Sequence, residues 1–371
     1  MIDLLQNLAV LQWRRSGAVI RDARIAGSRV WYAEFPPSVD ACGGRRVRRP
    51  DGDGAQPGQP PPALLLVHGM GASSMAYHQI IPFLRSSYRL IVPDLPGNGL
   101  SPPPAGREFL RFPELVDVVE ALTAKVAPGG ALVAGHSVGG WIAVKLAARC
   151  PDLIRGIALI SPSGPALTIE EWSDFFRVVS MLQEDAAAAN GLVRHLMRRA
   201  LKAADGSNSL DELMRRTFHK PPAMLRLVVR DLCRIMRGPA VVQLLANLKP
   251  EDYVSEQEAR RVRCPAILVW GERDRLIPEG CRTFYLQTLT GVRHEPIADC
   301  GHSALQEQPR RTAEILLQLR HLASGPAPDA AESARAGRGA GDGARLPGAR
   351  GAPAVKGAST AGSGSRAKSV R

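Results

Sequence analysis

A serine, a carboxylate and a histidine are the residues of this 371-residue chain that could together perform nucleophilic chemistry. Ser137 lies in the stretch GHSVG at 135–139, which fits the pattern G-x-S-x-G. An apolar run at 131–134 precedes the stretch and a helical pattern follows it, as expected of a sharp turn that exposes a serine above a sheet. A match to this short pattern can also be a glycine-rich turn with an idle serine. The flanking strand and helix favour a nucleophile.

A serine hydroxyl becomes a nucleophile when a base takes its proton and an acid orients that base. Downstream, Asp274 follows the apolar run 266–270 in the stretch WGERD, and His302 lies in CGHS before a helical pattern. The order Ser, Asp, His is the one found in one large group of serine hydrolases. Glu272 is the competing carboxylate, but it lies closer to the strand. Asp274 is therefore the preferred orienting acid, and His302 the preferred base.

A third glycine-rich segment, HGMGAS at 68–73, follows the apolar run 63–67. Attack on a carbonyl creates an oxyanion, which backbone N–H groups held in place can stabilise. The residue after the nucleophile, Val138, supplies one such amide, and Met70 is placed to supply the other. We interpret the turn-rich loop PDLPGNGLS at 93–101 as support for this site.

Short β-rich runs alternate with helical patterns along the chain, which predicts a mostly parallel sheet with helices on both faces. The expected strands are 29–34, 63–67, 88–93, 131–134, 154–160 and 266–270. The expected helices are 75–84, 113–126, 138–149 and 312–322.

The stretch 164–263 contains no clear strand and many helix-forming residues, so it predicts a helical cap over the carboxyl edge of the sheet, where ligands of such folds bind. Within it, Arg194, Arg198 and Lys202 recur at every fourth residue and would form one basic stripe, which Arg199 widens. This stripe is either a solvated helix face or a surface that attracts an anionic substrate or an acidic carrier protein.

Composition divides the rest of the chain into an N-terminal segment, two parts of the core and a C-terminal tail. We expect an N-terminal helix at 1–24, a first core part at 25–163 with a flexible loop at 36–62, and a second core part at 264–323. Residues 324–371 read as a disordered, basic tail rich in Ala and Gly, with eight Lys and Arg against three Asp and Glu from residue 325 onward. The first thirteen residues lack a basic region and a cleavage site, so the expected role is a helix packed on the body, with contact to a membrane surface as the alternative.

Composition excludes several classes of protein. The net charge is +13 and 45% of the residues are hydrophobic, which is typical of a globular chain. No uncharged apolar stretch of eighteen residues occurs, so no membrane span is expected. The six cysteines form no CxxC pair, which favours reduced thiols and a cytoplasmic location. No metal-ligand spacing, nucleotide loop or nucleic-acid recognition motif is present, so no cofactor, metal or specific nucleic acid is expected.

The chain resembles the α/β-hydrolase superfamily over about residues 25–323. The resemblance rests on HGMGAS, PDLPGNGLS, GHSVGG, GERDRLIP and CGHSALQEQP, which occur in family order. It implies an α/β-hydrolase fold with an eight-stranded, mostly parallel sheet and a helical cap inserted after the sixth strand. It assigns Ser137, Asp274 and His302 to the triad, and Met70 and Val138 to the oxyanion hole. Asn98 stands where many relatives carry histidine, a departure that changes little.

The resulting function is a serine esterase or lipase that acts on a small-molecule ester. A serine rather than an aspartate at the turn disfavours the epoxide hydrolase and haloalkane dehalogenase branches. A carbon–carbon bond hydrolase, an enol-lactonase or a cofactor-free peroxidase with the same triad is the alternative. A non-catalytic binding protein on the same fold is a third possibility.

Overall fold

The computed structural model describes most of the chain up to residue 324. The described residues are 2–38, 60–107, 110–167, 214–221 and 239–324. By its contacts the chain divides into one unit at Met1–Ala327 and a second at Pro328–Arg371. The second unit, and with it the predicted tail, lies outside the described residues, as does nearly all of the predicted loop 36–62.

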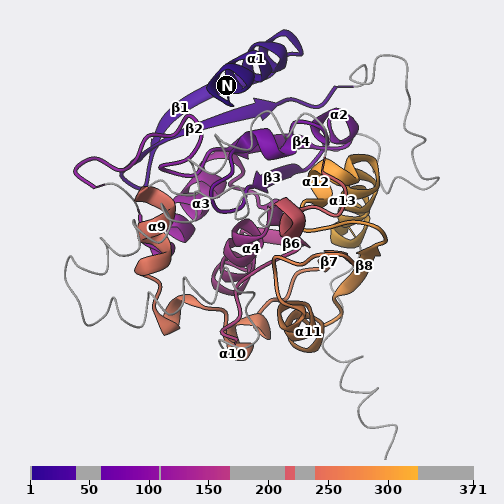
Figure 1. The fold of residues 1–371 in the computed structure, drawn as a ribbon. Coiled ribbons are helices and arrows are strands. Elements are labelled where there is room, and N and C mark those ends of the chain that lie inside the picture. The colour runs from indigo at the N-terminus through magenta and orange to yellow at the C-terminus, as the bar shows by residue number, and fades with distance from the viewer. Residues whose placement is uncertain (1, 39–59, 108–109, 168–213, 222–238, 325–371) are drawn as a thin grey trace, which may run out of the picture. The chain divides into compact units, whose positions relative to one another are not determined.

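The first unit is built on an eight-stranded sheet with the strand order β1-β2-β4-β3-β5-β6-β7-β8 (Figure 1). The strands are β1 (Val19–Ile25), β2 (Ser28–Phe35), β3 (Ala63–Val67), β4 (Arg89–Pro93), β5 (Ala131–His136), β6 (Ile154–Ile160), β7 (Ala266–Gly271) and β8 (Arg293–Ile297). The pairs β1–β2 and β2–β4 are antiparallel, and the remaining neighbours are parallel. The prediction of a mostly parallel, eight-stranded sheet is confirmed.

Helices cover both faces of this sheet because the central strands are apolar on both sides. In β3 all five residues are buried; Ala63, Leu65 and Val67 belong to one hydrophobic cluster, and Leu64 and Leu66 to the other. Side chains of a strand alternate between its faces, so this run needs a helical layer on each side. The helices of the first cluster are α3 (Phe112–Val126), α4 (Val138–Arg149), α9 (Pro239–Ala246), α10 (Glu256–Ala259) and α11 (Glu279–Thr288). Those of the second are α1 (Ile2–Arg15), η1 (Ser74–Tyr77), α2 (Ile81–Leu84), α12 (Ala304–Glu307) and α13 (Pro309–Ser324).

Several elements differ from the sequence prediction. The segment 1–24, expected to be a helix, contains α1 and then β1, so the sheet begins before residue 25. Both β1 and β8 were missed because they are edge strands, where charged residues and proline are tolerated and apolar alternation is weak. The expected helix 75–84 is split into η1 and α2, since Pro82 fits only the first turn of a helix. Helix α11 was missed because few of its residues are buried.

The two ends of the inserted stretch 164–263 lie together. Pro165 forms a parallel bridge with Val254, and the Val254 amide donates to the Gly164 carbonyl over 2.9 Å. Helix α9 (Pro239–Ala246), the short helix η3 (Pro250–Asp252) and α10 occupy the described end of the stretch. Residues 168–213 and 222–238, with the predicted basic stripe, lie outside the described residues, so the helical cap stays a prediction.

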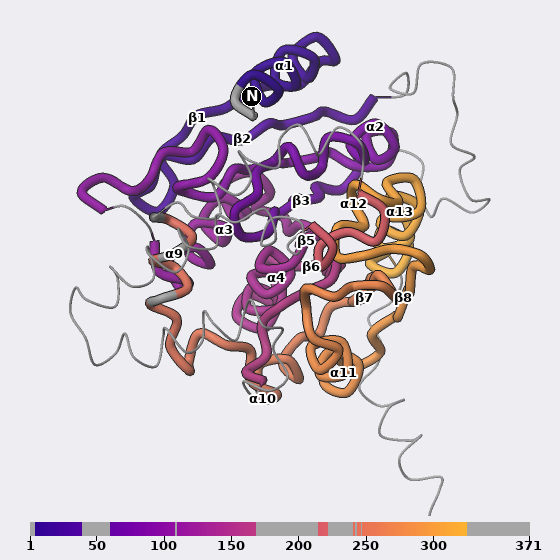
Figure 2. Tube along the Cα trace, viewed as in Figure 1, coloured from indigo at the N-terminus to yellow at the C-terminus, as the bar shows by residue number. Residues whose placement is uncertain are grey.

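The helices of the described residues are short or carry many charged side chains. Among the residues that the structure describes, no helix combines the length and the apolar character needed to cross a membrane. The trace in Figure 2 follows the same elements without their ribbons.

Candidate active site

Ser137 lies at the turn between β5 and α4, as its motif predicts. Its φ of 55° and ψ of −116° fall in a region that a residue with a side chain adopts only under strain. The turn is tight: a Cβ on Gly135 would lie 2.1 Å from the Gly139 carbonyl oxygen, and a Cβ on Gly139 would lie 2.0 Å from the Val67 carbonyl oxygen. The two glycines are therefore required for the turn itself.

The serine side chain is half-buried, and its hydroxyl makes no hydrogen bond to any described residue. Its backbone is held firmly. The Ser137 amide donates to the Ile160 carbonyl over 2.9 Å, and the Gly140 amide donates to the Ser137 carbonyl over 2.9 Å. The strained turn thus presents an uncommitted hydroxyl from a fixed backbone.

His302 and Asp274 form a buried hydrogen bond. His302 Nδ1 lies 2.9 Å from Asp274 Oδ2, and their side chains are 5% and 0% exposed. The second carboxylate oxygen, Oδ1, accepts the amides of Leu276 at 2.9 Å and Ile277 at 3.0 Å. Because a carboxylate only accepts, Nδ1 carries the proton of a neutral His302 and Nε2 carries the lone pair. The competing carboxylate, Glu272, belongs to an exposed residue.

His136 joins the serine turn to the histidine loop. Its Nε2 lies 3.0 Å from the His302 carbonyl oxygen, and the two rings lie 4.6 Å apart between centroids. Burial, followed by the nearby His302, lowers the pKa of His136 to about 3, so its ring is neutral near pH 7. A neutral ring with one N–H can donate that proton to the carbonyl. The residue before Ser137 therefore anchors the residue expected to act as its base.

Glu307 is a further link, and the sequence patterns did not predict it. Its Oε1 accepts the Gly301 amide over 2.9 Å, and its Oε2 accepts the amides of His219 and Lys220 over 2.9 and 2.8 Å. The carboxylate thereby fastens the segment 214–221 to the loop that carries His302. No spacing rule marks this role, because its partners are backbone amides from two distant segments.

The turn after β3 lies directly against the serine. A Cβ on Gly69 would lie 3.1 Å from Ser137 Cβ. Within the described part of the chain, neither the Met70 amide nor the Val138 amide has a hydrogen-bond acceptor. Two amides without partners therefore lie near Ser137, and their role as an oxyanion site stays a prediction.

Buried polar groups hold this turn in place. His68 Nδ1 lies 2.7 Å from the Gly69 carbonyl oxygen, and the Leu95 amide donates to His68 Nε2 over 2.9 Å. Burial lowers the pKa of His68 and raises the pKa of the adjacent Asp94. Asp94 accepts the Ser74 amide at 2.6 Å and the Leu100 amide at 2.7 Å. Residues of the loop 93–101 therefore hold the turn after β3 in place.

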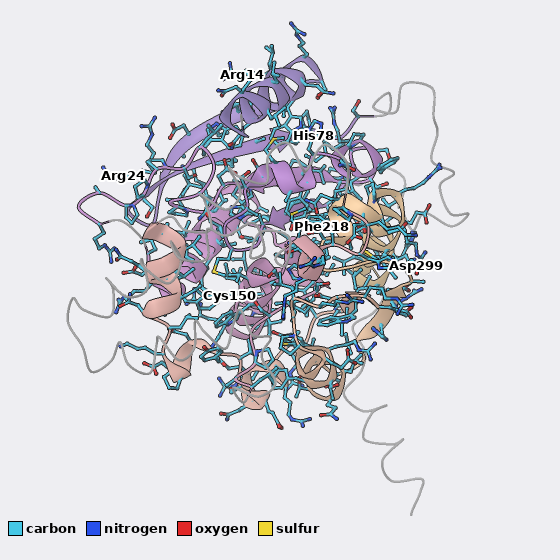
Figure 3. All side chains as sticks on the ribbon, in the orientation of Figure 1. Arg14, Arg24, His78, Cys150, Phe218 and Asp299 are labelled. Atoms are coloured by element: carbon cyan, nitrogen blue, oxygen red, sulfur yellow. The ribbon has the colours of Figure 1, made fainter. Side chains whose placement is uncertain are left out.

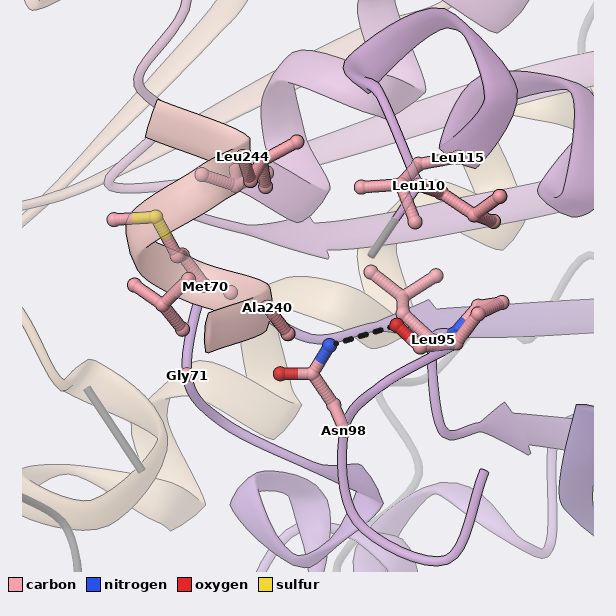
Figure 4. A pocket seen from close by; sticks show the side chains of 12 residues that line it. Met70, Gly71, Leu95, Asn98, Leu110, Leu115, Ala240 and Leu244 are labelled. Atoms are coloured by element: carbon pink, nitrogen blue, oxygen red, sulfur yellow. Dashed lines mark hydrogen bonds between the residues drawn. The ribbon is translucent and has the colours of Figure 1, made fainter. Parts of the chain in front are cut away.

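A largely apolar pocket adjoins the two free amides (Figure 4). It encloses about 370 Å³, its solvent-open part included. Helix α9, the start of α3 and the loops after β3 and β4 form its walls. The lining residues are Gly69, Met70, Gly71, Leu95, Pro96, Asn98, Leu110, Leu115, Val138, Ala240, Val241 and Leu244. Asn98 contributes the one amide side chain of this lining, and it donates to the Pro96 carbonyl over 3.2 Å.

The residues that the structure describes contain no group of three or more His, Cys, Asp or Glu side chains placed to hold a metal ion.

Comparison with known proteins bears on this arrangement. A family model described as "Alpha/beta hydrolase family" matches residues 64–315, more than half of the chain. The chain belongs to the alpha/beta hydrolase family. The resemblance and the fold class inferred from the motifs are thus confirmed.

Curated members of the alpha/beta hydrolase family are similar to this chain at low identity. The uncharacterized hydrolase YugF of Bacillus subtilis is 24% identical over 68% of this chain and 87% of its own length. Monoacylglycerol lipase ABHD6 of Bos taurus is 23% identical over 70% and 75%. A pimeloyl-[acyl-carrier protein] methyl ester esterase of Chromobacterium violaceum is 28% identical over 62% and 82%.

Solved structures of alpha/beta hydrolases share the fold. A membrane phospholipase A described as a bacterial virulence factor matches with a TM-score of 0.66 and 21% identity, over 87% of this chain and 92% of its own. A meta-cleavage product hydrolase from Pseudomonas fluorescens IP01 matches with a TM-score of 0.57 and 16% identity, over 81% and 97%. Since such enzymes share one fold, the fold alone does not select the reaction.

Proposed function

We propose that this alpha/beta hydrolase cleaves carboxylic esters through a covalent intermediate on Ser137, with His302 as base and Asp274 as orienting acid. The buried hydrogen bond between His302 Nδ1 and Asp274 Oδ2 carries this proposal, because it leaves the Nε2 lone pair free to accept a proton. The bond from His136 to the His302 carbonyl supports it by joining the base to the serine turn.

The reaction proceeds in two halves. His302 Nε2 takes the hydroxyl proton of Ser137 as its Oγ attacks the ester carbonyl carbon, and Asp274 stabilises the imidazolium. The same proton passes to the departing alcohol, which leaves an acyl group on Oγ. Water then attacks the acyl carbon, gives a proton to Nε2, and releases the acid when that proton returns to Ser137. The Met70 and Val138 amides stabilise the oxyanion in both halves.

The pocket accommodates the acyl chain. Met70 and Val138 belong both to the proposed oxyanion site and to the pocket lining, so a carbonyl held there directs a substituent among Leu95, Leu115 and Leu244. An apolar lining with one amide favours an uncharged hydrocarbon chain. Two relatives are named for ester chemistry, a monoacylglycerol lipase and a methyl ester esterase, which supports a carboxylic ester as the substrate.

Labelling with a fluorophosphonate probe tests the nucleophile. The native protein is expected to be labelled and to hydrolyse p-nitrophenyl esters, whereas Ser137→Ala loses both activities. Ser324→Ala is the matched control, because Ser324 lies at the end of α13 and its hydroxyl donates to the Arg320 carbonyl. Equal labelling of native protein and Ser137→Ala would refute the proposed nucleophile. Labelling without turnover of any ester would favour the carbon–carbon hydrolase alternative.

An anionic ester or an acidic carrier protein remains the proposed partner of the basic stripe Arg194, Arg198 and Lys202. The stripe lies outside the described residues, so the argument rests on its spacing in the sequence. If it steers an anionic substrate, kcat/KM for an anionic ester falls with salt more steeply than for a neutral ester. The double variant Arg194→Glu, Arg198→Glu should remove that difference, and equal salt dependence in the native protein would refute the role. The cytoplasmic location also stays a prediction.

A further inference from the structure

Helix α1 has apolar residues on two opposite faces. Its inner face buries Ala9 and Trp13, together with the amide side chain of Gln6. Its outer face carries Leu4, Leu8 and Leu11, which are 61%, 52% and 44% exposed. At 100° per residue the outer leucines lie on the side of the helix opposite Ala9 and Trp13. They therefore point away from the body of the protein.

The inner face alone accounts for the docking of α1. Trp13 Nε1 donates to His78 Nδ1 over 3.0 Å, and the Trp13 ring packs edge-on against Phe35 at 5.5 Å between centroids. Gln6 Nε2 donates to Asp94 Oδ2 over 3.3 Å. The helix runs along the part of the sheet formed by β1 and β2, and no other described element covers its outer side (Figures 1 and 2). The outer leucines add nothing to this attachment.

The leucines at positions 4, 8 and 11 form one exposed row along the helix, which is an unusual arrangement. The described residues contain six exposed large apolar side chains, and three of them form this row, spaced over about 10 Å of helix. Single exposed leucines are common, but a contiguous group of apolar side chains is typical of a surface that contacts a protein, a membrane or a ligand.

Two arginines extend the row. Arg14 and Arg15 form the last turn of α1, and both are exposed. Arg15 follows Leu11 by four residues and so lies on the leucine face, while Arg14, labelled in Figure 3, lies at the flank of that face. Neither guanidinium forms an ion pair with a described side chain, and the whole chain carries a net charge of +13. Free cations beside an apolar row are complementary to a surface that is anionic outside and apolar beneath.

We propose that α1 binds the surface of an anionic lipid bilayer, with Leu4, Leu8 and Leu11 at the acyl boundary and Arg14 and Arg15 at the headgroups. A helix of this kind lies in the plane of the interface and is held by its apolar face and by attraction to anionic lipids. A second copy of the chain fits less well. The three leucines expose on the order of 300 Å², whereas a stable dimer buries about 800 Å² per partner. A fluid bilayer adapts its surface to a narrow convex ridge without needing a matching groove.

Co-sedimentation of the full chain with vesicles tests this proposal. Vesicles of phosphatidylcholine with about 30% phosphatidylglycerol are expected to bind the native protein, and pure phosphatidylcholine vesicles to bind it weakly. The triple variant Leu4→Gln, Leu8→Gln, Leu11→Gln should lower the partition coefficient at least about tenfold. Each of Arg14→Gln and Arg15→Gln should lower it about fivefold on the anionic vesicles and leave the neutral ones unchanged.

Leu286→Gln is the matched control, because Leu286 is 37% exposed but lies on α11. It should bind vesicles like the native protein. All variants should keep the native unfolding temperature and ester turnover, since each side chain is exposed and none lies at the candidate site. Unchanged binding of the triple variant would overturn the proposal. So would a native dimer that the triple variant loses while neither protein binds vesicles.

Discussion

Replacing Asp274 by asparagine tests the arrangement of the candidate site with little disturbance of the fold. Asp274 Oδ1 accepts two backbone amides, from Leu276 and Ile277, while Oδ2 faces His302 Nδ1. An asparagine must turn its oxygen toward the two amides, since its NH₂ group would otherwise meet their N–H groups. The NH₂ group then faces His302 Nδ1 and donates to it.

This orientation reverses the tautomer of the histidine. Nδ1 becomes an acceptor, the proton moves to Nε2, and Nε2 loses the lone pair that removes the proton of Ser137. We expect kcat/KM for p-nitrophenyl butyrate to fall about 10⁴-fold, which corresponds to about 5.5 kcal/mol of transition-state stabilisation. Stability should change little because both amides keep an acceptor. Asp274→Ala leaves them without one and should cost about 1–3 kcal/mol of unfolding free energy.

The assay is ester turnover and the rate of fluorophosphonate labelling, measured with the unfolding temperature of the same samples. Glu272→Gln is the matched control, since this exposed carboxylate lies two residues away on the same loop, and we expect near-native activity from it. A folded Asp274→Asn variant that keeps activity within about tenfold of the native protein would refute the assigned role. A large loss in Glu272→Gln would transfer that role to the neighbouring carboxylate.

Three further predictions follow from the geometry. Gly139→Ala should lower the free energy of unfolding in urea by about 2–4 kcal/mol, because its Cβ would lie 2.0 Å from the Val67 carbonyl oxygen. Gly129→Ala is the control and should leave stability unchanged, because no atom lies within 4 Å of its Cβ. Equal stability of the two variants would contradict the tight turn. Burial lowers the pKa of His136 to about 3, so its ring stays neutral in the folded protein while the unfolded chain binds a proton below about pH 6.5. The free energy of unfolding should therefore fall by about 1.4 kcal/mol per pH unit as the pH drops from about 6.5 toward 3. His136→Gln should flatten this pH dependence in urea titrations, and an unchanged slope would argue against a buried neutral ring. Leu244→Trp should fill the pocket and shift the preferred p-nitrophenyl ester toward shorter acyl chains; an unchanged preference would place the acyl chain elsewhere.

The local pattern of the sequence determined the fold class and the residues of the candidate site. Strands β3 and β6 were predicted to the residue, because a continuous apolar run bounded by turns has few alternatives once both faces are buried. The turn at Ser137 was predicted for a different local reason, because the glycines around the serine are required by a turn that only small residues fit. Strands β1 and β8 were not predicted, since an edge strand is stabilised by its single neighbour rather than by an apolar pattern of its own.

Tertiary structure decided what spacing along the chain cannot encode. The sequence favoured Asp274 over Glu272 by position alone, and the fold supplies the physical reason: the loop after β7 turns the Asp274 carboxylate toward His302 and holds it with two amides. Likewise, Glu307 joins two segments through backbone amides, which carry no sequence signal. The outward leucines of α1 also emerged only from the fold. The sequence shows a helix with many apolar residues, but which of them are buried depends on the partners that the rest of the chain supplies.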